Sequence, residues 1–417
     1  MDGLAPTSAL LGRRLDRLRS LGRPAVGQSW PTARPDHARA LADAVGGRVE
    51  RTSAGAVVWL ETEVKVAVDR GALRTLPYPV GAEQPFVCLD LETTGLATAA
   101  GTVAFLVGLG FWDGSRMAVR QLLLPDHADE DAFLDALVEA LPADAWLVTY
   151  NGRTFDWPLL VARFRLHRRS PPPFAGHLDL LPVARQLWKH RLGNARLATV
   201  EGAVCAVVRD GDLPGALIPE RYFGYLRSRR GELLRDVVEH NRQDIVSLGL
   251  LLAVLGGYAS DANWARLHPG DMAGLARGLL ARGRVDDALR CVEAALAADA
   301  WSLGVTDGAI IRRHLSAERA RLLARLGRRA DAHAAWLEIA THGGPGAALA
   351  WLHVARHREH AEQDVAGALD ACREAATVAE RARLWDRPML AIEADLERRL
   401  ARLRRKSFAR RTLSRAA

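Results

Sequence analysis

The chain has 417 residues, enough for two or three domains. Hydrophobic residues make up 49% and charged residues 25%, which is typical of globular proteins and excludes a largely disordered chain. The formal net charge is +8, but nine Arg or Lys and no acid occur from Arg398 onward, so the rest of the chain is close to neutral. Such a basic tail suits nucleic acid or another polyanion, and the alternative is a solvated helix end.

Residues 1–80 are predicted to hold a helix at 8–21 and one or two short strands at 56–68, with no function assigned. No basic segment leads into an apolar core, and no apolar run is long enough to span a bilayer. We therefore expect a cytoplasmic protein without a membrane partner. The four cysteines are scattered, which makes a zinc ribbon or a disulfide framework unexpected.

Residues 81–258 are predicted to form an α/β domain with a mixed five-stranded sheet covered by helices. Three strands come first, at 86–90, 102–112 and 116–124, and Asp113-Gly114 is a hairpin signal between the last two. Helices and strands then alternate, with further strands at 145–150 and 177–181. The ribonuclease-H-like fold has this order of elements.

Residues 259–397 change to Ala, Leu and Arg at helical spacing. The stretches 275–297 and 318–340 each pair two helices around a glycine turn, at Gly283 and Gly327, and 350–376 is a looser copy. The pattern resembles tetratricopeptide (TPR) helical repeats, so we expect an all-α array of helical hairpins followed by a basic tail at 398–417.

The stretch FVCLDLETTG ends an apolar strand on two acids. Residues i and i+2 of a strand face the same side, so Asp90 and Glu92 project together. Two like charges repel, and their burial is costly unless a cation neutralises them. Hard divalent cations bind carboxylate oxygens, so a metal site is one interpretation and a solvated strand end is the other.

Three further stretches add acids. Asp156 follows a strand in YNGRTFDWPLL, where an acid also stabilises a helix start. His240 and Asp244 lie four residues apart on one helix face, where a surface pair is the alternative. Asp179 in HLDLL is best explained as a helix cap.

Taken together, these stretches resemble the DEDD exonuclease superfamily and, more closely, the bacterial YprB-type ribonuclease-H-like domain. The matching segments are LDLETTGL, AFLVGLG, LVTYNGRTFDWPLL, HLDLLPVAR, DLPGALIPERYFGYL and HNRQDIVSL. The resemblance covers residues 81–258 and implies a metal-dependent nuclease, most readily a 3′→5′ exonuclease.

The resemblance also implies four ligands for two Mg²⁺ or Mn²⁺ ions: Asp90, Glu92, Asp156 and Asp244. His240 takes the place of the general base, although related families have Tyr at this spacing or His one residue earlier. An imidazole with a pKa near 6.5 suits proton transfer near neutral pH. The interpretation requires the four acids to share one cleft that is free of a competing cation such as an arginine head group.

Softer assignments concern the substrate and partners. Thr93, Thr94, Gly95 and Asn151 are predicted to contact the nucleic acid, DNA or RNA, although turns also favour these residues. The helical array is a candidate site for a protein partner. Two alternatives stay open: a weakly active or inactive nuclease-fold adaptor that binds nucleic acid or protein through the helical repeats, and a structure-specific endonuclease.

The array contains one more pattern, in which His353, His357 and His360 share a helix face. This spacing could bind a transition metal, but a partly exposed repeat helix is the simpler interpretation.

Overall fold

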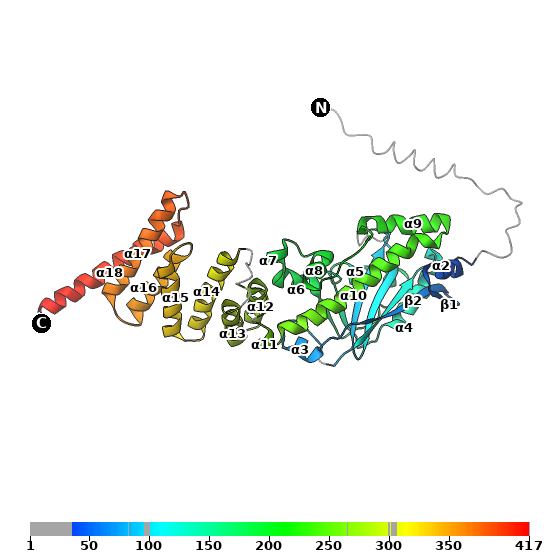
Figure 1. Cartoon of the computed structure of the whole chain (residues 1–417), viewed down its shortest axis with the longest axis horizontal. Coiled ribbons are helices and arrows are strands. Elements are labelled where there is room, and N and C mark those ends of the chain that lie inside the picture. Colours follow the sequence, from blue (N-terminus) through cyan, green and yellow to red (C-terminus); the bar gives the residue numbers. More distant parts are fainter. Residues whose placement is uncertain are drawn as a thin grey trace, which may run out of the picture. The chain divides into compact units, whose positions relative to one another are not determined.

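A computed structural model describes residues 36–81, 83–95, 101–264, 266–298, 301 and 307–416, with side chains described to residue 409. Its first part is a sheet covered by helices and its second part is helical (Figure 1). The helix predicted at 8–21 lies outside the described residues.

The sheet contains seven strands in the order β1-β2-β5-β4-β3-β6-β7. The strands β3, β6 and β7 pair in parallel, and the other neighbours are antiparallel. The bounds are β1 (Arg48–Thr52), β2 (Gly55–Lys65), β3 (Phe86–Thr93), β4 (Ala104–Asp113), β5 (Arg116–Leu123), β6 (Trp146–Thr149) and β7 (Gly176–Asp179).

The expected fold class is confirmed, but the count of five strands was too low. The segment predicted as one or two strands at 56–68 forms β2, which pairs with β5 along residues 58–65, and β1 precedes the predicted segment. These two strands extend the sheet beyond the predicted domain start.

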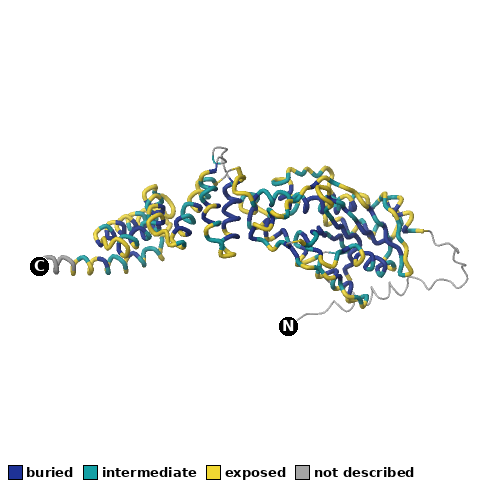
Figure 2. The backbone as a smooth tube through the Cα atoms, turned by 90° about the horizontal axis from the view of Figure 1, so that it is seen from below, coloured by how far each residue is buried: buried dark blue, intermediate teal, exposed yellow. Residues whose placement is uncertain are grey.

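Helices cover both faces of the sheet. They are α2 (His37–Val45), α3 (Arg70–Thr75), α4 (Glu130–Ala140), α5 (Asp156–Leu166), α6 (Leu180–Leu187), α7 (Lys189–Leu192), α8 (Leu197–Val204), α9 (Ile218–Ser228), α10 (Arg235–Tyr258) and α11 (Asp261–Trp264). Short 3₁₀ turns lie at His127–Asp129, Gly215–Leu217 and Gly231–Leu234. Figure 2 shows the strands as the buried centre of this part, with exposed residues around them.

Strand β3 shows why the sheet is buried on both sides. Its odd positions, Val87 and Leu89, join the core beneath α4, α5 and α9, while Phe86 and Cys88 join the core beneath α6 and α10. All four side chains are almost completely buried. The continuous apolar run therefore reflects a strand covered on both faces rather than an alternating one.

The second part consists of helical hairpins. The helices are α12 (Pro269–Ala281), α13 (Val285–Leu296), α14 (Gly308–Arg325), α15 (Arg329–His342), α16 (Ala347–His360), α17 (Val365–Leu384) and α18 (Leu390–Ala416). The predicted turns at Gly283 and Gly327 join α12 to α13 and α14 to α15, with φ of 75° and 78°. These left-handed values explain the glycines, because other residues adopt them at a cost.

The C-terminal basic segment continues α18 rather than forming a separate tail. Among the described residues, no helix has both the length and the apolar character needed to cross a bilayer. The cytoplasmic location stays a prediction.

Candidate metal centre of the sheet domain

Asp90 and Glu92 lie on the face of β3 that α10 covers, two and four residues beyond Cys88. The register of the ladder shifts between Glu92 and Thr93, and Thr93, the last residue of β3, pairs with Ala104 of β4. The strand therefore ends just beyond its two acids, as the sequence predicts. Asp90 is half-buried and Glu92 is buried.

Helix α10 reaches these acids because β4 offers it a glycine. A Cβ on Gly108 would overlap Asn241 Oδ1 and would lie 2.7 Å from Ile245 Cγ1. Asn241 is fully buried, and its Nδ2 donates to Asp90 Oδ2 at 2.9 Å. Gln121 Nε2 donates to Asn241 Oδ1 at 2.9 Å and fixes the orientation of the amide. Close packing thus positions Asp90.

The four predicted acids influence one another's ionisation. Burial raises the pKa of Asp90 well above its usual value, and the charges of Asp244, Glu92 and Asp156 raise it further. Burial and the charges of Asp244 and Asp156 raise the pKa of Glu92 in the same way. Burial, Asp179 and Asp244 raise the pKa of Asp156 to about 7. Burial and the charges of neighbouring carboxylates thus act in the same direction on these three acids.

An arginine enters this space. Arg209 Nη2 donates to Asp244 Oδ1 at 2.5 Å, and its Nη1 lies 3.0 Å from Asp212 Oδ2. Its other contacts are a two-pronged pair with Glu201, which is 1% exposed. The expectation of a cleft without a competing cation is therefore wrong, and the convergence of the four acids on a cation site stays a prediction. Burial raises the pKa of Asp244, and the charges of His240 and Arg209 oppose that rise.

His240 is held by a carboxylate that the sequence interpretation left without a role. Its Nδ1 lies 2.6 Å from Asp212 Oδ1, and its Nε2 lies 3.7 Å from Asp244 Oδ2. Although burial opposes it, the hydrogen bonds from His240 and Arg209 lower the pKa of Asp212. An ionised carboxylate only accepts hydrogen bonds, so Nδ1 carries a proton and Nε2 is free to accept one in the neutral ring.

Asp179 and Asn151 shape the neighbouring turn. Asp179 caps α6 by accepting from Leu181 N, as predicted, and its Oδ1 also accepts from Asn151 N at 2.8 Å. Asn151 has a φ of 71°, a left-handed value that asparagine tolerates better than most residues. This turn leads directly to Asp156 at the start of α5.

The predicted substrate contacts after β3 already have local partners. Thr93 Oγ1 donates to Gly95 O at 2.7 Å, and Thr94 Oγ1 accepts from Val103 N at 2.9 Å. Their contact with a substrate stays a prediction.

The comparison with protein families identifies the fold. The sequence model of the RNase H superfamily matches residues 87–255. These residues form an RNase H superfamily domain. The chain is also similar to the uncharacterized protein YprB of Bacillus subtilis (strain 168), with 35% identity over 206 residues, or 49% of this chain. The chain spans about half, 50%, of the length of that curated relative. Membership of the superfamily supports a nuclease-like fold.

The chemistry of the RNase H-like site fits divalent cations. Its donors are carboxylate oxygens, which Mg²⁺ and Mn²⁺ prefer. Six carboxyl groups gather there against one arginine and one histidine, so internal charges do not neutralise them. They are Asp90, Glu92, Asp156, Glu201, Asp212 and Asp244. Among the described residues, no three of these acids bring ligand atoms within 4.8 Å of one another, so they line a space wider than a closed shell around one ion.

The sequence interpretation missed Arg209, Asp212, Glu201 and Asn241 as parts of the site. A signal was present for two of them, since Asp212 opens the matching segment DLPGALIPERYFGYL and Asn241 lies in HNRQDIVSL. Asn241 follows His240 directly but points to β3.

Proposed function

We propose that the RNase H-like domain hydrolyses nucleic-acid phosphodiesters with two divalent cations, Mg²⁺ or Mn²⁺, and acts as a 3′→5′ exonuclease of the DEDD type. The observation that carries the proposal is that burial and the charges of neighbouring carboxylates raise the pKa values of all four acids, Asp90, Glu92, Asp156 and Asp244. Burying this much like charge is costly without a function that brings cations to it. The exonuclease polarity comes from the family resemblance.

Each residue of the site has a role in the proposed reaction. Asp90, Glu92, Asp156 and Asp244 hold the cations, which when bound activate a water and stabilise the leaving oxygen. His240 accepts a proton at Nε2, and Asp212 keeps its other nitrogen protonated. Asn241 keeps the Asp90 carboxylate turned toward the cleft through its hydrogen bond to Oδ2.

Arg209 has to release Asp244 when a cation binds there. Its anchors at Glu201 and Asp212 do not depend on Asp244, so the guanidinium stays at the cleft edge after the release. There its freed N–H groups can donate to a phosphate oxygen, a partner that suits the planar guanidinium.

The same contact favours a second candidate function. In an inactive nuclease-fold adaptor, Arg209 would take the place of a cation permanently and the helical array would be the functional part. Calorimetric titration with Mn²⁺ separates the two: the nuclease binds the ion at the acids, and the adaptor does not.

The decisive test is hydrolysis of end-labelled single-stranded DNA and RNA with Mn²⁺. Asp90→Asn and Asp244→Asn remove cation ligands and should each cost about 4 kcal/mol of transition-state stabilisation, a loss of about 10³-fold in rate. Asp113→Asn, an exposed acid of the β4–β5 turn, is the matched control and should retain full activity.

Unchanged hydrolysis in Asp90→Asn and Asp244→Asn would refute the assignment. Products that shorten one nucleotide at a time from the 3′ end identify an exonuclease, whereas internal fragments identify a structure-specific endonuclease.

A further inference from the structure

A cavity of about 670 Å³ in the helical array is lined by cationic side chains. It lies between α14, α15 and α16, and we call it the basic pocket. Three arginines and four histidines line it, without a carboxylate among the lining residues: Arg321, Arg329, Arg356, His333, His353, His357 and His360.

Stacked rings give the basic pocket a fixed wall. Trp336 of α15 stacks on His353 of α16 with centroids 4.1 Å apart and planes at 4°. His333 stacks on His357 in the same way, at 4.2 Å and 14°. These pairs join the two helices and use ring faces for packing. The groups left for a ligand are mainly ring N–H edges and guanidinium groups.

The positive charge of the basic pocket is poorly balanced from within. Arg329 and Arg356 are exposed, and neither forms an ion pair within the described part of the chain. Burial lowers the pKa of His353, and the charges of Arg356 and Arg321 lower it further. Two nearby carboxylates offset part of the charge: Glu318 pairs with Arg321 at 3.0 Å, and Glu362 lies 3.6 Å from His357 Nε2. An anion would relieve the remaining repulsion.

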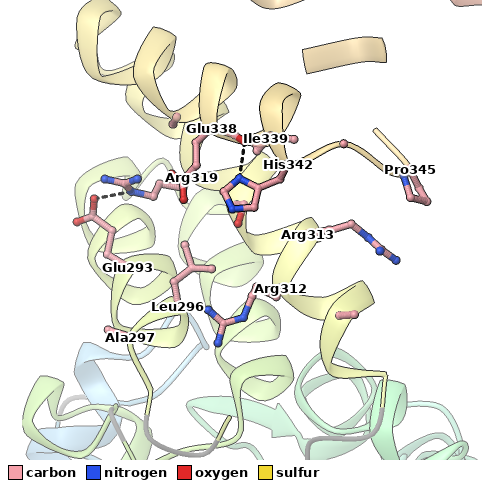
Figure 3. A pocket seen from close by; sticks show the side chains of 14 residues that line it. Glu293, Leu296, Ala297, Arg312, Arg313, Arg319, Glu338, Ile339, His342 and Pro345 are labelled. Atoms are coloured by element: carbon pink, nitrogen blue, oxygen red, sulfur yellow. Dashed lines mark hydrogen bonds and ion pairs between the residues drawn. The ribbon is translucent and has the colours of Figure 1, made fainter. Parts of the chain in front are cut away.

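A neighbouring cavity has carboxylates as well as arginines in its lining. It has a volume of about 730 Å³ and lies between α13, α14 and α15 (Figure 3). Arg319 there pairs with Glu293 at 3.1 Å, and Glu338 adds a second carboxylate to the lining. Two carboxylates thus stand against the three arginines of this lining, Arg312, Arg313 and Arg319, whereas no carboxylate is among the described residues that line the basic pocket.

A transition metal fits the basic pocket less well than an anion. His333, His357 and Glu362 bring ligand atoms within 4.8 Å of one another. However, the two rings are nearly parallel, and lone pairs that lie in parallel planes cannot both point at one ion. His333 Nδ1 also has no hydrogen-bond partner in the described structure, whereas metal-bound histidines usually donate from their second nitrogen.

We propose that the basic pocket binds the phosphate backbone of a single nucleic-acid strand. The choice of this polyanion rests on the proposed function of the RNase H-like domain. Unpaired arginines and imidazole N–H groups suit phosphate oxygens. Trp336 is only 4% exposed and offers no platform for base stacking, so binding is independent of sequence.

The test measures binding by fluorescence anisotropy with the full chain in EDTA, which separates binding from hydrolysis. The probe is a labelled single strand of about 20 nucleotides, titrated over a range of salt concentrations. Arg329→Gln and Arg356→Gln should each weaken binding and reduce the slope of log K against log salt by about 0.7, the value for one lost phosphate contact on a single strand.

Arg381→Gln removes the same charge from an exposed arginine of α17 outside the pocket and should leave the slope unchanged. Equal slopes in the pocket variants and the wild type would overturn the inference. So would displacement of the strand by poly-glutamate at equal charge concentration, because the partner would then be an acidic protein. Circular dichroism confirms that each variant is folded.

Hydrolysis of the small diester bis(p-nitrophenyl) phosphate with Mn²⁺ tests the acidic site without the pocket. Hydrolysis together with unchanged salt slopes in the pocket variants would refute nucleic-acid binding by the basic pocket and would still support the nuclease. Reduced slopes without hydrolysis would support the pocket and count against the nuclease.

Discussion

Arg209 is a cation that lies within the acidic site and contacts three of its carboxylates. It contacts Glu201, Asp212 and Asp244, and its side chain is 11% exposed. Asp212 in turn holds His240. One loop residue therefore links Asp244, a proposed cation ligand, to the proposed base. In the proposed nuclease, cation binding and the position of Arg209 depend on each other.

Arg209→Gln should bind Mn²⁺ more tightly than the wild type. The substitution removes a competing hydrogen bond to Asp244 and leaves Glu201 and Asp212 uncompensated, and both effects favour an added cation. A hydrogen bond to a charged group contributes about 1.5–3 kcal/mol, so the gain should be about tenfold or more in affinity by calorimetry.

Arg227→Gln, at an exposed position of α9, is the matched control. Equal or weaker Mn²⁺ binding by Arg209→Gln would show that the guanidinium does not compete with the ion.

The acids could be predicted from sequence, and their neighbours could not. Asp90 and Glu92 show their common direction through strand periodicity alone. Arg209 and Asp212 lie in an irregular segment with no periodicity, and their contacts with Asp244 and His240 span about 30 residues of chain. Which side chains of such a segment reach the site depends on the path of the segment in three dimensions.

At the scale of elements, the site depends on how closely α10 approaches the sheet. Gly108 and Gly110 of β4 leave room for Asn241 and Ile245, since a Cβ on Gly110 would lie 2.9 Å from Ile245 Cγ2. Glycine inside a strand often marks such a close approach of a neighbouring element. The packing of α10 sets the position of Asp244 as well as that of Asn241.

Gly108→Ala should therefore disturb the acidic site, although Gly108 itself is not one of its ligands. The added methyl group forces α10 away from β4, which should cost about 1–3 kcal/mol of stability and weaken Mn²⁺ binding through displaced Asn241 and Asp244. Urea unfolding and calorimetry measure the two effects.

Gly256→Ala provides the control for this substitution, because Gly256 lies on α10 with nothing within 4 Å of an added Cβ. It should be neutral or slightly stabilising, by up to about 1 kcal/mol. If Gly108→Ala behaved like this control, the close packing of α10 would not be what positions the acids.

The strands β1 and β2, which were not assigned to the predicted sheet, show what local sequence patterns fail to predict. The alternation at 56–68 is enough to predict strands, and β2 occupies most of that range. Its partner β5 lies more than 50 residues further along, so pairing depends on a shared core and not on local pattern. The number of strands in the sheet was therefore not available from periodicity.

At the scale of the whole molecule, acid should weaken the fold through His177. This residue of β7 is 8% exposed, and its Nε2 lies 2.8 Å from Thr149 Oγ1. Burial and the charge of Arg153 lower its pKa to about 4. The unfolded chain, with a histidine pKa near 6.5, binds this proton first. Stability is therefore complete above about pH 6.5 and is lost as the pH falls toward 4.

The full effect of this titration is about 3 kcal/mol between pH 6.5 and 4. His177→Gln keeps a polar partner for Thr149 and removes the proton. Its free energy of unfolding in urea should fall less over this range than that of the wild type. Parallel losses in both proteins would assign acid sensitivity to other groups.

Glu359 of α16 has a consequence for every experiment on the basic C-terminal helix. Its buried carboxylate accepts from Arg402 and Lys406 at 2.5 and 2.7 Å, and Arg399 lies 3.6 Å away. Nine cations make this end of the chain resemble a free polycation. Three of them, Arg399, Arg402 and Lys406, instead pair with Glu359 and attach α18 to α16. A version of the protein shortened before Arg398 would remove the three cations that pair with Glu359 and the contact between α16 and this part of α18. If such a truncation bound nucleic acid more weakly, the cause could be the altered packing of α16 and α18 as well as the lost positive charge. Single substitutions of the exposed residues Arg404 or Arg405 remove charge without this change in packing.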